Sequence, residues 1–315
     1  MSRLPQNLAA LAAGGKRALA DALAAIETMA GSPRLAALLD EAHGAPRAMT
    51  IGLTGPPGVG KSTLTDALVR AWRAKRLTVG VVAVDPSSLR TGGALLGDRA
   101  RINVEPGDRG VFIRSMAARD RLGGVSDQTV AAVAMMRALF DRVLIETVGV
   151  GQSEADVANI ADTVLLCIQP GSGDSLQFMK AGVMELPDVV VVTKGDMGPP
   201  ARRAKADVEG ALSLYERRDG GWATPVALVS ALERSGLEEI EAALGAHAAH
   251  LAQDGRLAWR RARQSEACVD QAIRARFGAA GLEAAQGLRA LLAGRGPFAR
   301  EQAISADLAR RLARE

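Results

Sequence analysis

The sequence predicts an α/β fold with a mainly parallel, doubly wound sheet, flanked by N-terminal helices and a C-terminal helical arm. Continuous runs of Val, Ile and Leu without alternation are typical of strands that are covered on both faces. Helical patterns separate several of these runs, as expected for the crossovers of a parallel sheet. A glycine-rich segment, Gly55–Ser62, stands directly between an apolar run and a helical pattern. Ligands of such folds bind at the carboxyl ends of the strands.

The expected elements follow in chain order. Residues 1–45 carry two or three short amphipathic helices, because Gly14-Gly15 and Gly31-Ser32-Pro33 interrupt the pattern. Six strands are expected, at Met49–Thr54, Val79–Val84, Arg142–Glu146, Thr163–Ile168, Val189–Thr193 and Val226–Ser230. Helical patterns include Thr63–Lys75, Gln128–Phe140 and Arg202–Tyr215. After Gly245 only helical patterns remain, so the predicted parts are 1–47, 48–245 and 246–315.

Composition narrows the class of protein. The chain has 315 residues, of which 48% are hydrophobic, enough to bury a large core. Its two cysteines, Cys167 and Cys268, cannot build a disulfide framework or a Cys-rich metal site. Charged residues interleave with Ala and Leu at the N-terminus, so we expect a cytoplasmic protein without a membrane partner. The net charge is +4, but acidic and basic residues alternate along most of the chain, which favours a solvated Arg-rich surface over nucleic-acid binding.

The segment Gly55–Ser62 reads GPPGVGKS and predicts a phosphate-binding P-loop. Its glycines let backbone N–H groups converge on phosphates, and the positive end of the next helix adds to their attraction. Lys61 is expected to reach the β- and γ-phosphates, and Ser62 to bind Mg²⁺. The residues expected at the nucleotide are Gly55, Pro56, Pro57, Gly58, Val59, Gly60, Lys61, Ser62 and Thr63.

Carboxylates close two of the expected strands. Asp85 and Glu146 stand at carboxyl ends, where they can hold the Mg²⁺ shell or orient water. A helix N-cap or an Asx turn before proline is the alternative for Asp85. For Asp98, in the loop that follows Asp85, a functional and an ordinary role are evenly balanced. Gly149 follows Glu146 and offers a backbone N–H to the γ-phosphate, which makes 148–152 a candidate switch.

Two further strand ends predict guanine recognition. Thr193, Lys194 and Asp196 form an [Asn/Thr]-Lys-x-Asp element, which reads guanine in P-loop GTPases. The Asp accepts from the two N–H donors of the base, and the Lys stem packs over its face. The turn of Ser230 and Ala231 supplies a backbone N–H to the guanine oxygen. Adenine has no matching donor pair, so GTP and GDP are the expected ligands; a helix cap is the alternative for the Asp.

Together these segments resemble the MeaB/ArgK family of P-loop GTPases, which includes the methylmalonic aciduria type A protein. The N-terminal helices and the C-terminal arm match that family in general character only. The matching stretches are GPPGVGKST (55–63), VAVDPSS (82–88), TGGALLGDRARI (91–102), FIRSMAARDRLGGV (112–125), ETVGVGQSE (146–154), PGSGDSLQ (170–177), TKGD (193–196) and SALERSGLEEI (230–240).

The resemblance implies a GTP-hydrolysing chaperone of an adenosylcobalamin-dependent acyl-CoA mutase, which gates cofactor loading and protects or reactivates the mutase. A cobalamin adenosyltransferase is a further candidate partner, and the helical tail resembles the family's dimerisation arm, which implies a homodimer. The resemblance places Asp85, Asp98 and Glu146 in the Mg²⁺ and hydrolysis site, with Lys180 as a candidate for completing it. The implied switch segments are 86–101, 147–154 and, responding to the mutase, 169–180.

Two departures from the family pattern and two other functions stand beside this interpretation. Thr193 replaces the usual Asn, which concerns nucleotide affinity more than base identity, and Asp120 stands where glycine is common. A metallochaperone-type GTPase is the alternative function, although His247 and His250 are expected as a solvated surface pair. A kinase is less favoured, because no acceptor pocket or base can be named.

Overall fold

The computed structural model describes residues 4–85, 107–117, 125–147, 153–171, 186–213 and 221–313; for Asp85 and for 153–155 it describes the backbone alone. The chain divides into two compact units. One comprises residues 1–48, 127–139 and 260–315, and the other comprises 49–126 and 140–259.

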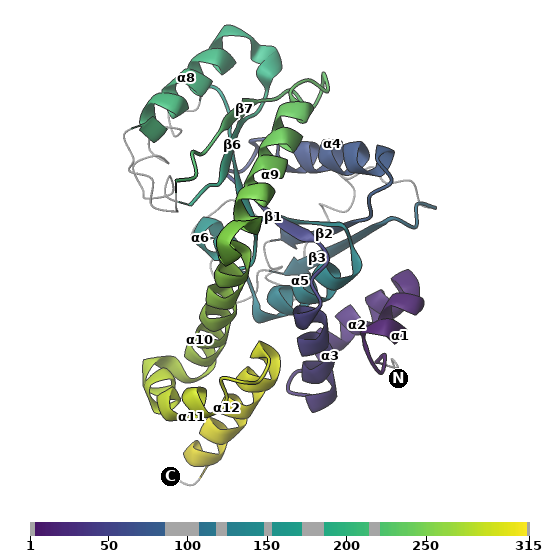
Figure 1. Cartoon of the computed structure of the whole chain (residues 1–315), viewed down its shortest axis with the longest axis vertical. Helices are drawn as coiled ribbons and strands as arrows, with labels where there is room; N and C mark the ends of the chain where they lie inside the picture. The colour runs from purple at the N-terminus through teal and green to yellow at the C-terminus, as the bar shows by residue number, and fades with distance from the viewer. Residues whose placement is uncertain are drawn as a thin grey trace. The chain divides into compact units, whose positions relative to one another are not determined.

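The larger unit is built on a seven-stranded sheet (Figure 1). The strands are β1 (Met49–Thr54), β2 (Val79–Asp85), β3 (Val111–Ala117), β4 (Arg142–Glu146), β5 (Thr163–Ile168), β6 (Val189–Val192) and β7 (Val226–Leu228). Their order is β3-β2-β4-β1-β5-β6-β7, and every neighbouring pair is parallel. This confirms the predicted doubly wound α/β fold, with all six predicted strands present.

Strand β3 was not predicted from the sequence. It pairs with β2 alone in the sheet order, so it is an edge strand, and most of its side chains are only partly buried. Arg114 and Ser115 interrupt its apolar residues, which an edge position tolerates and a central one does not. The polar pair breaks the continuous apolar run by which a buried strand is recognised in a sequence.

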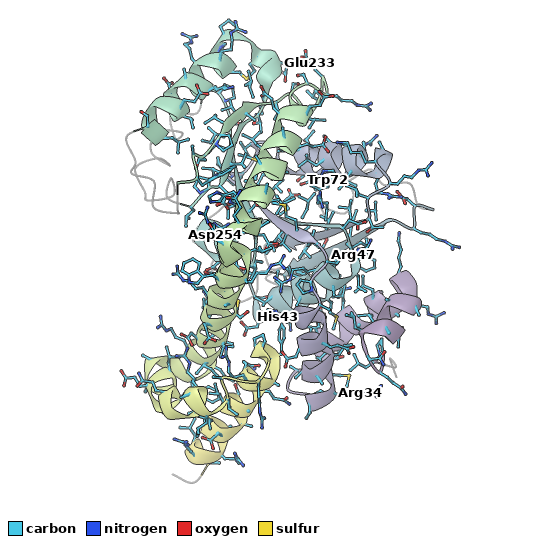
Figure 2. The ribbon with its side chains drawn as sticks, in the orientation of Figure 1. Arg34, His43, Arg47, Trp72, Glu233 and Asp254 are labelled. Atoms are coloured by element: carbon cyan, nitrogen blue, oxygen red, sulfur yellow. The ribbon has the colours of Figure 1, made fainter. Side chains whose placement is uncertain are left out.

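Helices cover both faces of the sheet in this unit. The helices of this unit are α4 (Lys61–Ala74), α6 (Ser153–Ala158), α8 (Pro199–Ser213), α9 (Leu237–Ala252) and the first residues of α10 (Arg256–Ala284), and short 3-10 turns lie at Gly195–Met197 and Gln253–Gly255. Helices α4 and α9 share one buried cluster with Ile51 of β1, and Trp72 of α4, labelled in Figure 2, is part of it. Gly52 faces the opposite side of the sheet, where an added Cβ would collide with the side chain of Val157 in α6. The alternation follows from the two-residue period of a strand.

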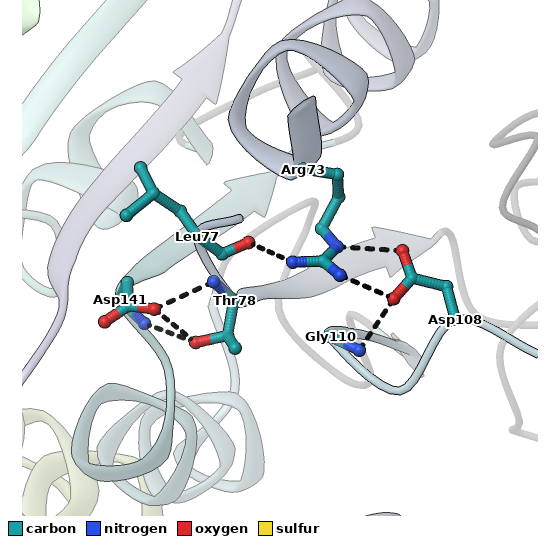
Figure 3. Close-up of polar contacts among 6 residues, drawn as sticks. All are labelled: Arg73, Leu77, Thr78, Asp108, Gly110 and Asp141. Carbon is teal, nitrogen blue, oxygen red and sulfur yellow. Dashed lines mark hydrogen bonds and ion pairs between the residues drawn. The ribbon is translucent and has the colours of Figure 1, made fainter. Parts of the chain in front are cut away.

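Polar contacts anchor the end of the sheet at which the strands begin (Figure 3). Arg73 donates two hydrogen bonds of 2.8 Å to Asp108, whose carboxylate also accepts from the backbone N–H of Gly110 next to β3. The bonded carboxylate raises the pKa of Arg73. Thr78, just before β2, donates its hydroxyl to Asp141, just before β4, over 2.7 Å. The amino ends of β2, β3 and β4 are therefore anchored without any residue of the predicted nucleotide site.

The smaller unit is helical. Its elements are α1 (Leu8–Ala13), α2 (Gly15–Thr28), α3 (Pro33–Gly44), α5 (Asp127–Leu139), α10 from Arg260 onward, α11 (Gln286–Leu291) and α12 (Pro297–Leu312). Helix α10 is interrupted at Gly278, which has a φ of +72°. Ile273 before this interruption packs with Ile304 and Leu308 of α12 in one buried cluster. Within the described residues, no helix is both long enough and apolar enough to cross a membrane.

Candidate nucleotide-binding site

The P-loop has the glycine conformations that the sequence predicts. Gly55 has a φ of +136°, and an added Cβ would collide with the carbonyl oxygen of Cys167. Gly60, with a φ of +101°, forms the N-cap of α4. Positive φ values of this kind are favourable for glycine alone. The loop therefore lies directly on the carboxyl end of β5 and leads into the first turn of α4, the setting in which backbone N–H groups bind phosphate.

Cys167 forms part of the floor beneath this loop. The side chain is fully buried, and burial raises the pKa of its thiol to about 12, against a smaller lowering effect of the Lys61 ammonium. A thiol with this pKa stays protonated at neutral pH, so it packs as a small apolar group. Cys167 is therefore a packing residue beneath the P-loop.

Lys61 is folded back over the start of its own loop. Its ammonium donates hydrogen bonds to the carbonyl oxygens of Gly55, over 2.7 Å, and Pro56, over 3.1 Å. The residue is only 7% exposed. A cation held at this place sits beside the N–H groups of the loop, where it can meet a phosphate oxygen as a point charge.

Glu146 ends β4 and is brought to α4 by the pairing of β4 with β1. Its Oε1 accepts a hydrogen bond of 2.6 Å from the Ser62 hydroxyl, and its Oε2 accepts one of 3.0 Å from Thr65. Glu146 is only 4% exposed. Carboxylate and hydroxyl oxygens are the ligands that Mg²⁺ takes in nucleotide sites, so Ser62 and Glu146 fit a bound magnesium ion.

Thr147 connects the end of β4 to the strand that precedes the P-loop. Its backbone N–H donates to the carbonyl oxygen of Leu53 over 3.1 Å, and its hydroxyl lies 3.3 Å from that of Thr54. The residue is almost fully buried. The first residue of the predicted segment 147–154 is thus fixed to β1, directly before the P-loop.

Thr193 contacts the P-loop through its hydroxyl, which lies 2.7 Å from the carbonyl oxygen of Val59 and 3.1 Å from that of Ile168. An Asn at this position could reach the same carbonyl with its amide N–H. The substitution that sets this chain apart from the family pattern therefore keeps a polar link from the end of β6 to the P-loop.

The other residues that the sequence predicts to bind guanine lie together at the ends of β6 and β7. The backbone N–H of Gly195 donates to the carbonyl oxygen of Val229, and the Ser230 hydroxyl donates to Asp196 over 2.7 Å. Asp196 is exposed and not buried, and this contact holds its carboxylate beside the turn of Ser230 and Ala231. The two segments that the sequence predicts for one base are thus adjacent in space.

Lys194 has left-handed backbone angles, with φ at +55°. Its ammonium donates a 2.6 Å hydrogen bond to the side-chain oxygen of Gln169, the residue after β5. Gln169 is the first residue of the predicted third switch, 169–180. The side chain expected to cover the base is therefore connected to the start of that segment.

His247 corrects one expectation. The sequence predicted a solvated pair with His250, but His247 is only 1% exposed. Its Nδ1 lies 2.7 Å from the hydroxyl of Thr163, which begins β5, and its Nε2 lies 3.2 Å from Asp188, just before β6. This cluster lies at the amino ends of the strands, and the P-loop lies at their carboxyl ends. The burial of His247 could not be predicted from the sequence, because its partners lie 59 or more residues away along the chain.

Several predicted site residues lie outside the described residues. Asp98, Gly149 and Lys180 are among them, as is Asp120. Asp85 ends β2 as predicted, but its side chain is not described. Thr65, in contrast, was missed. Its spacing of three residues after Ser62 on a helix was the signal that could have revealed it.

Comparisons with known proteins agree with this geometry. The family model described as "Methylmalonyl Co-A mutase-associated GTPase MeaB" matches residues 19–285. The GTPase ArgK of Escherichia coli is 36% identical over 270 residues, which cover 83% of this chain and 81% of that protein. The methylmalonic aciduria type A homolog, mitochondrial, of Mus musculus is 41% identical over 201 residues, 63% of this chain and 48% of that protein.

A solved structure shows the same fold. The crystal structure titled as a LAO/AO transport system kinase superimposes with a TM-score of 0.69 at 29% identity, covering 91% of this chain and 85% of that one. The family model spans well over half of the chain, and the relatives are named GTPases. The chain is therefore a guanine-nucleotide-binding P-loop GTPase that belongs to the methylmalonyl Co-A mutase-associated GTPase MeaB family.

Proposed function

We propose that this GTPase is a chaperone of an adenosylcobalamin-dependent acyl-CoA mutase of the methylmalonyl-CoA mutase type. In this role it gates cofactor loading and protects or reactivates the mutase. The match to a family described as mutase-associated, over residues 19–285, carries the proposal. The similarity to a protein named for methylmalonic aciduria supports it.

The site divides its tasks among residues that the fold brings together. Ser62 and Glu146 would hold Mg²⁺, which, when bound, neutralises charge on the phosphate oxygens. Lys61 binds phosphate with an ammonium already fixed at the loop. Glu146 accepts a hydrogen bond from the Ser62 hydroxyl, so that a lone pair of the Ser62 oxygen is left for the ion.

Guanine is bound at the neighbouring strand ends. Asp196 accepts from the two N–H donors of the base, and the Lys194 stem covers its face. Ser230 keeps the Asp196 carboxylate beside the turn that offers the N–H of Ala231. Thr193 stabilises the P-loop from the same side. A base without the paired donors makes no hydrogen bonds to this carboxylate, so ATP gains less binding free energy than GTP.

Hydrolysis depends on residues that the partner arranges. Asp85, Asp98 and Lys180 complete the Mg²⁺ and hydrolysis site, and the backbone of Gly149 senses the γ-phosphate. The mutase acts on 169–180, whose first residue already contacts Lys194. In this proposal intrinsic turnover is slow, because the missing transition-state stabilisation comes with the partner.

The proposal has further parts at the level of the whole protein. The chain acts as a homodimer through its C-terminal arm, 246–315, in the cytoplasm, with 1–47 as a helical extension of the GTPase domain 48–245. A cobalamin adenosyltransferase is a second candidate partner, because loading of the mutase needs a source of its cofactor.

Steady-state GTP hydrolysis with Mg²⁺, with and without the mutase of the same organism, tests the chaperone role. We expect the mutase to raise GTP turnover at least several-fold and to leave ATP turnover at background. The variant Glu146→Gln, which keeps the side-chain shape, should remove most of the stimulated turnover. GTP turnover that ignores the mutase would reject this role and would favour metal delivery, which titration with Ni²⁺ or Zn²⁺ then examines.

A further inference from the structure

Thr65 occupies a position that the nucleotide chemistry does not require. It lies on α4 three residues after Ser62, which places both hydroxyls on one helix face. Thr65 also lies roughly 4.5 Å farther along the helix axis than Ser62, the last residue of the P-loop motif. The side chain is fully buried, and its hydroxyl donates to Oε2 of Glu146 over 3.0 Å. It therefore reaches the site through the carboxylate alone.

The two hydroxyls hold the Glu146 carboxylate at both of its oxygens. Ser62 contacts Oε1 over 2.6 Å, and Thr65 contacts Oε2 over 3.0 Å. A glutamate has three rotatable side-chain bonds, and two separate contacts on its terminal group fix the plane of that group. Glu146 is 4% exposed, so little water can replace a lost donor, and the loss of a hydrogen bond to a buried carboxylate is costly.

We infer that Thr65 is a positioning residue for the magnesium site: its hydroxyl holds Oε2 of Glu146 and so keeps Oε1 directed at Ser62. This inference rests on the proposed role of Glu146 and Ser62 at Mg²⁺. Without the Thr65 hydroxyl, the carboxylate turns toward other donors, and the paired oxygens needed by the ion are no longer set in advance.

The test measures Mg²⁺ binding without relying on turnover. GDP carrying a methylanthraniloyl fluorophore is bound to the full chain, and its release is followed as free Mg²⁺ is varied. For Thr65→Val, which keeps the shape and removes the hydroxyl, we expect the Mg²⁺ concentration that half-maximally slows release to rise about tenfold. Release in EDTA should match wild type, and Thr65→Ser should restore the Mg²⁺ dependence.

Thr78→Val is the matched control. Thr78 also donates its hydroxyl to a carboxylate, that of Asp141, but at the amino ends of the strands. Its loss should lower the melting temperature and leave the Mg²⁺ dependence unchanged. If Thr65→Val behaves in the same way, Thr65 is a structural residue and the inference is wrong. Should Thr65→Val not fold, Thr65→Ala takes its place with the same expected shift.

Glu146→Gln separates this inference from the proposed function. We expect it to shift the Mg²⁺ dependence more than Thr65→Val does, because it alters the carboxylate itself. A Glu146→Gln variant with wild-type Mg²⁺ dependence would show that the proposed metal site is wrong. A shift in Glu146→Gln with none in Thr65→Val would overturn the role of Thr65 alone.

Discussion

Single residues decide whether the P-loop can form. At Gly55 two constraints coincide, a φ of +136° and the carbonyl oxygen of Cys167 in the space that a Cβ would take. We predict that Gly55→Ala destabilises the fold by about 2 kcal/mol or more and weakens GDP binding at least tenfold. Chemical denaturation and fluorescent GDP titration measure both effects. Gly44→Ala, where a Cβ meets nothing, is the control and should neither destabilise the fold nor weaken GDP binding; equal losses at both positions would contradict the steric account.

The hydroxyl of Thr193 provides a second prediction at this scale. Thr193→Ala removes its contact with the carbonyl oxygen of Val59 and should lower GDP affinity about five- to tenfold, the effect of losing one buried hydrogen bond. Thr193→Asn should restore most of the affinity. Thr224→Ala removes a hydroxyl that donates to the Pro187 carbonyl, before the amino ends of β6 and β7. This control should leave GDP affinity unchanged. An unaffected Thr193→Ala variant would mean that this hydroxyl does not support the loop.

Among single residues, the sequence could predict those that belong to a local motif or end a recognisable strand. Lys61 and Ser62 belong to one motif, and Glu146 ends a clear strand, so their meeting follows from parallel topology. The partners of Thr65 and His247 do not follow, because each depends on which helix face meets which strand end. The spacing of Thr65 places its hydroxyl on the helix face of Ser62 but does not identify the carboxylate that it meets, and a histidine on an amphipathic helix gives no local indication of its partner.

At the scale of elements, a side chain of α3 caps α12. The Asp40 carboxylate accepts from the backbone N–H groups of Phe298, over 3.0 Å, and Ala299, over 2.9 Å. Asp40→Asn loses the charge and one acceptor at the positive end of that helix, so we predict about 1 kcal/mol less unfolding free energy in urea. Asp254→Asn, at an 80% exposed side chain, should change it little. Equal losses would show that the cap is not stabilising.

A histidine connects three helices of the smaller unit. The Arg137 guanidinium donates to Nδ1 of His43, and Nε2 of His43 lies 3.1 Å from the Ser265 hydroxyl. Because arginine can only donate, His43 is neutral with its proton on Nε2. Burial, with Arg137 and Arg261 adding repulsion, lowers the pKa of His43 to about 4.

This lowered pKa predicts a pH dependence of stability. Between pH 6.5 and 4 the unfolded chain binds a proton at His43 that the folded chain does not, so the free energy of unfolding falls as pH falls through that window. Above pH 6.5 the contribution of His43 is fully retained. Melting temperatures of wild type and His43→Gln, compared from pH 7 to 4.5, measure the effect. Wild type should lose more than the variant, and parallel curves would contradict the prediction.

At the scale of the whole molecule, the chain joins a nucleotide unit with a helical unit, and the family model spans residues of both. Six strands and their parallel, doubly wound arrangement were predictable because buried parallel strands are continuous apolar runs, whereas the order of the strands was not predicted. The edge strand β3 was not, and neither was the grouping of α5 with α2 and α3 in one unit, since α5 lies between two strands in sequence. Long-range packing decides such grouping, and no local pattern records it.

The affinity of the mutase for this chain in two nucleotide states tests the central claim most directly. Titration calorimetry with the adenosylcobalamin-dependent mutase of the same organism compares the chain loaded with GDP and with a non-hydrolysable GTP analogue, both with Mg²⁺. The account predicts that the two affinities differ by about fivefold or more, as coupling between two sites requires. Equal affinities, or no binding in either state, would contradict it.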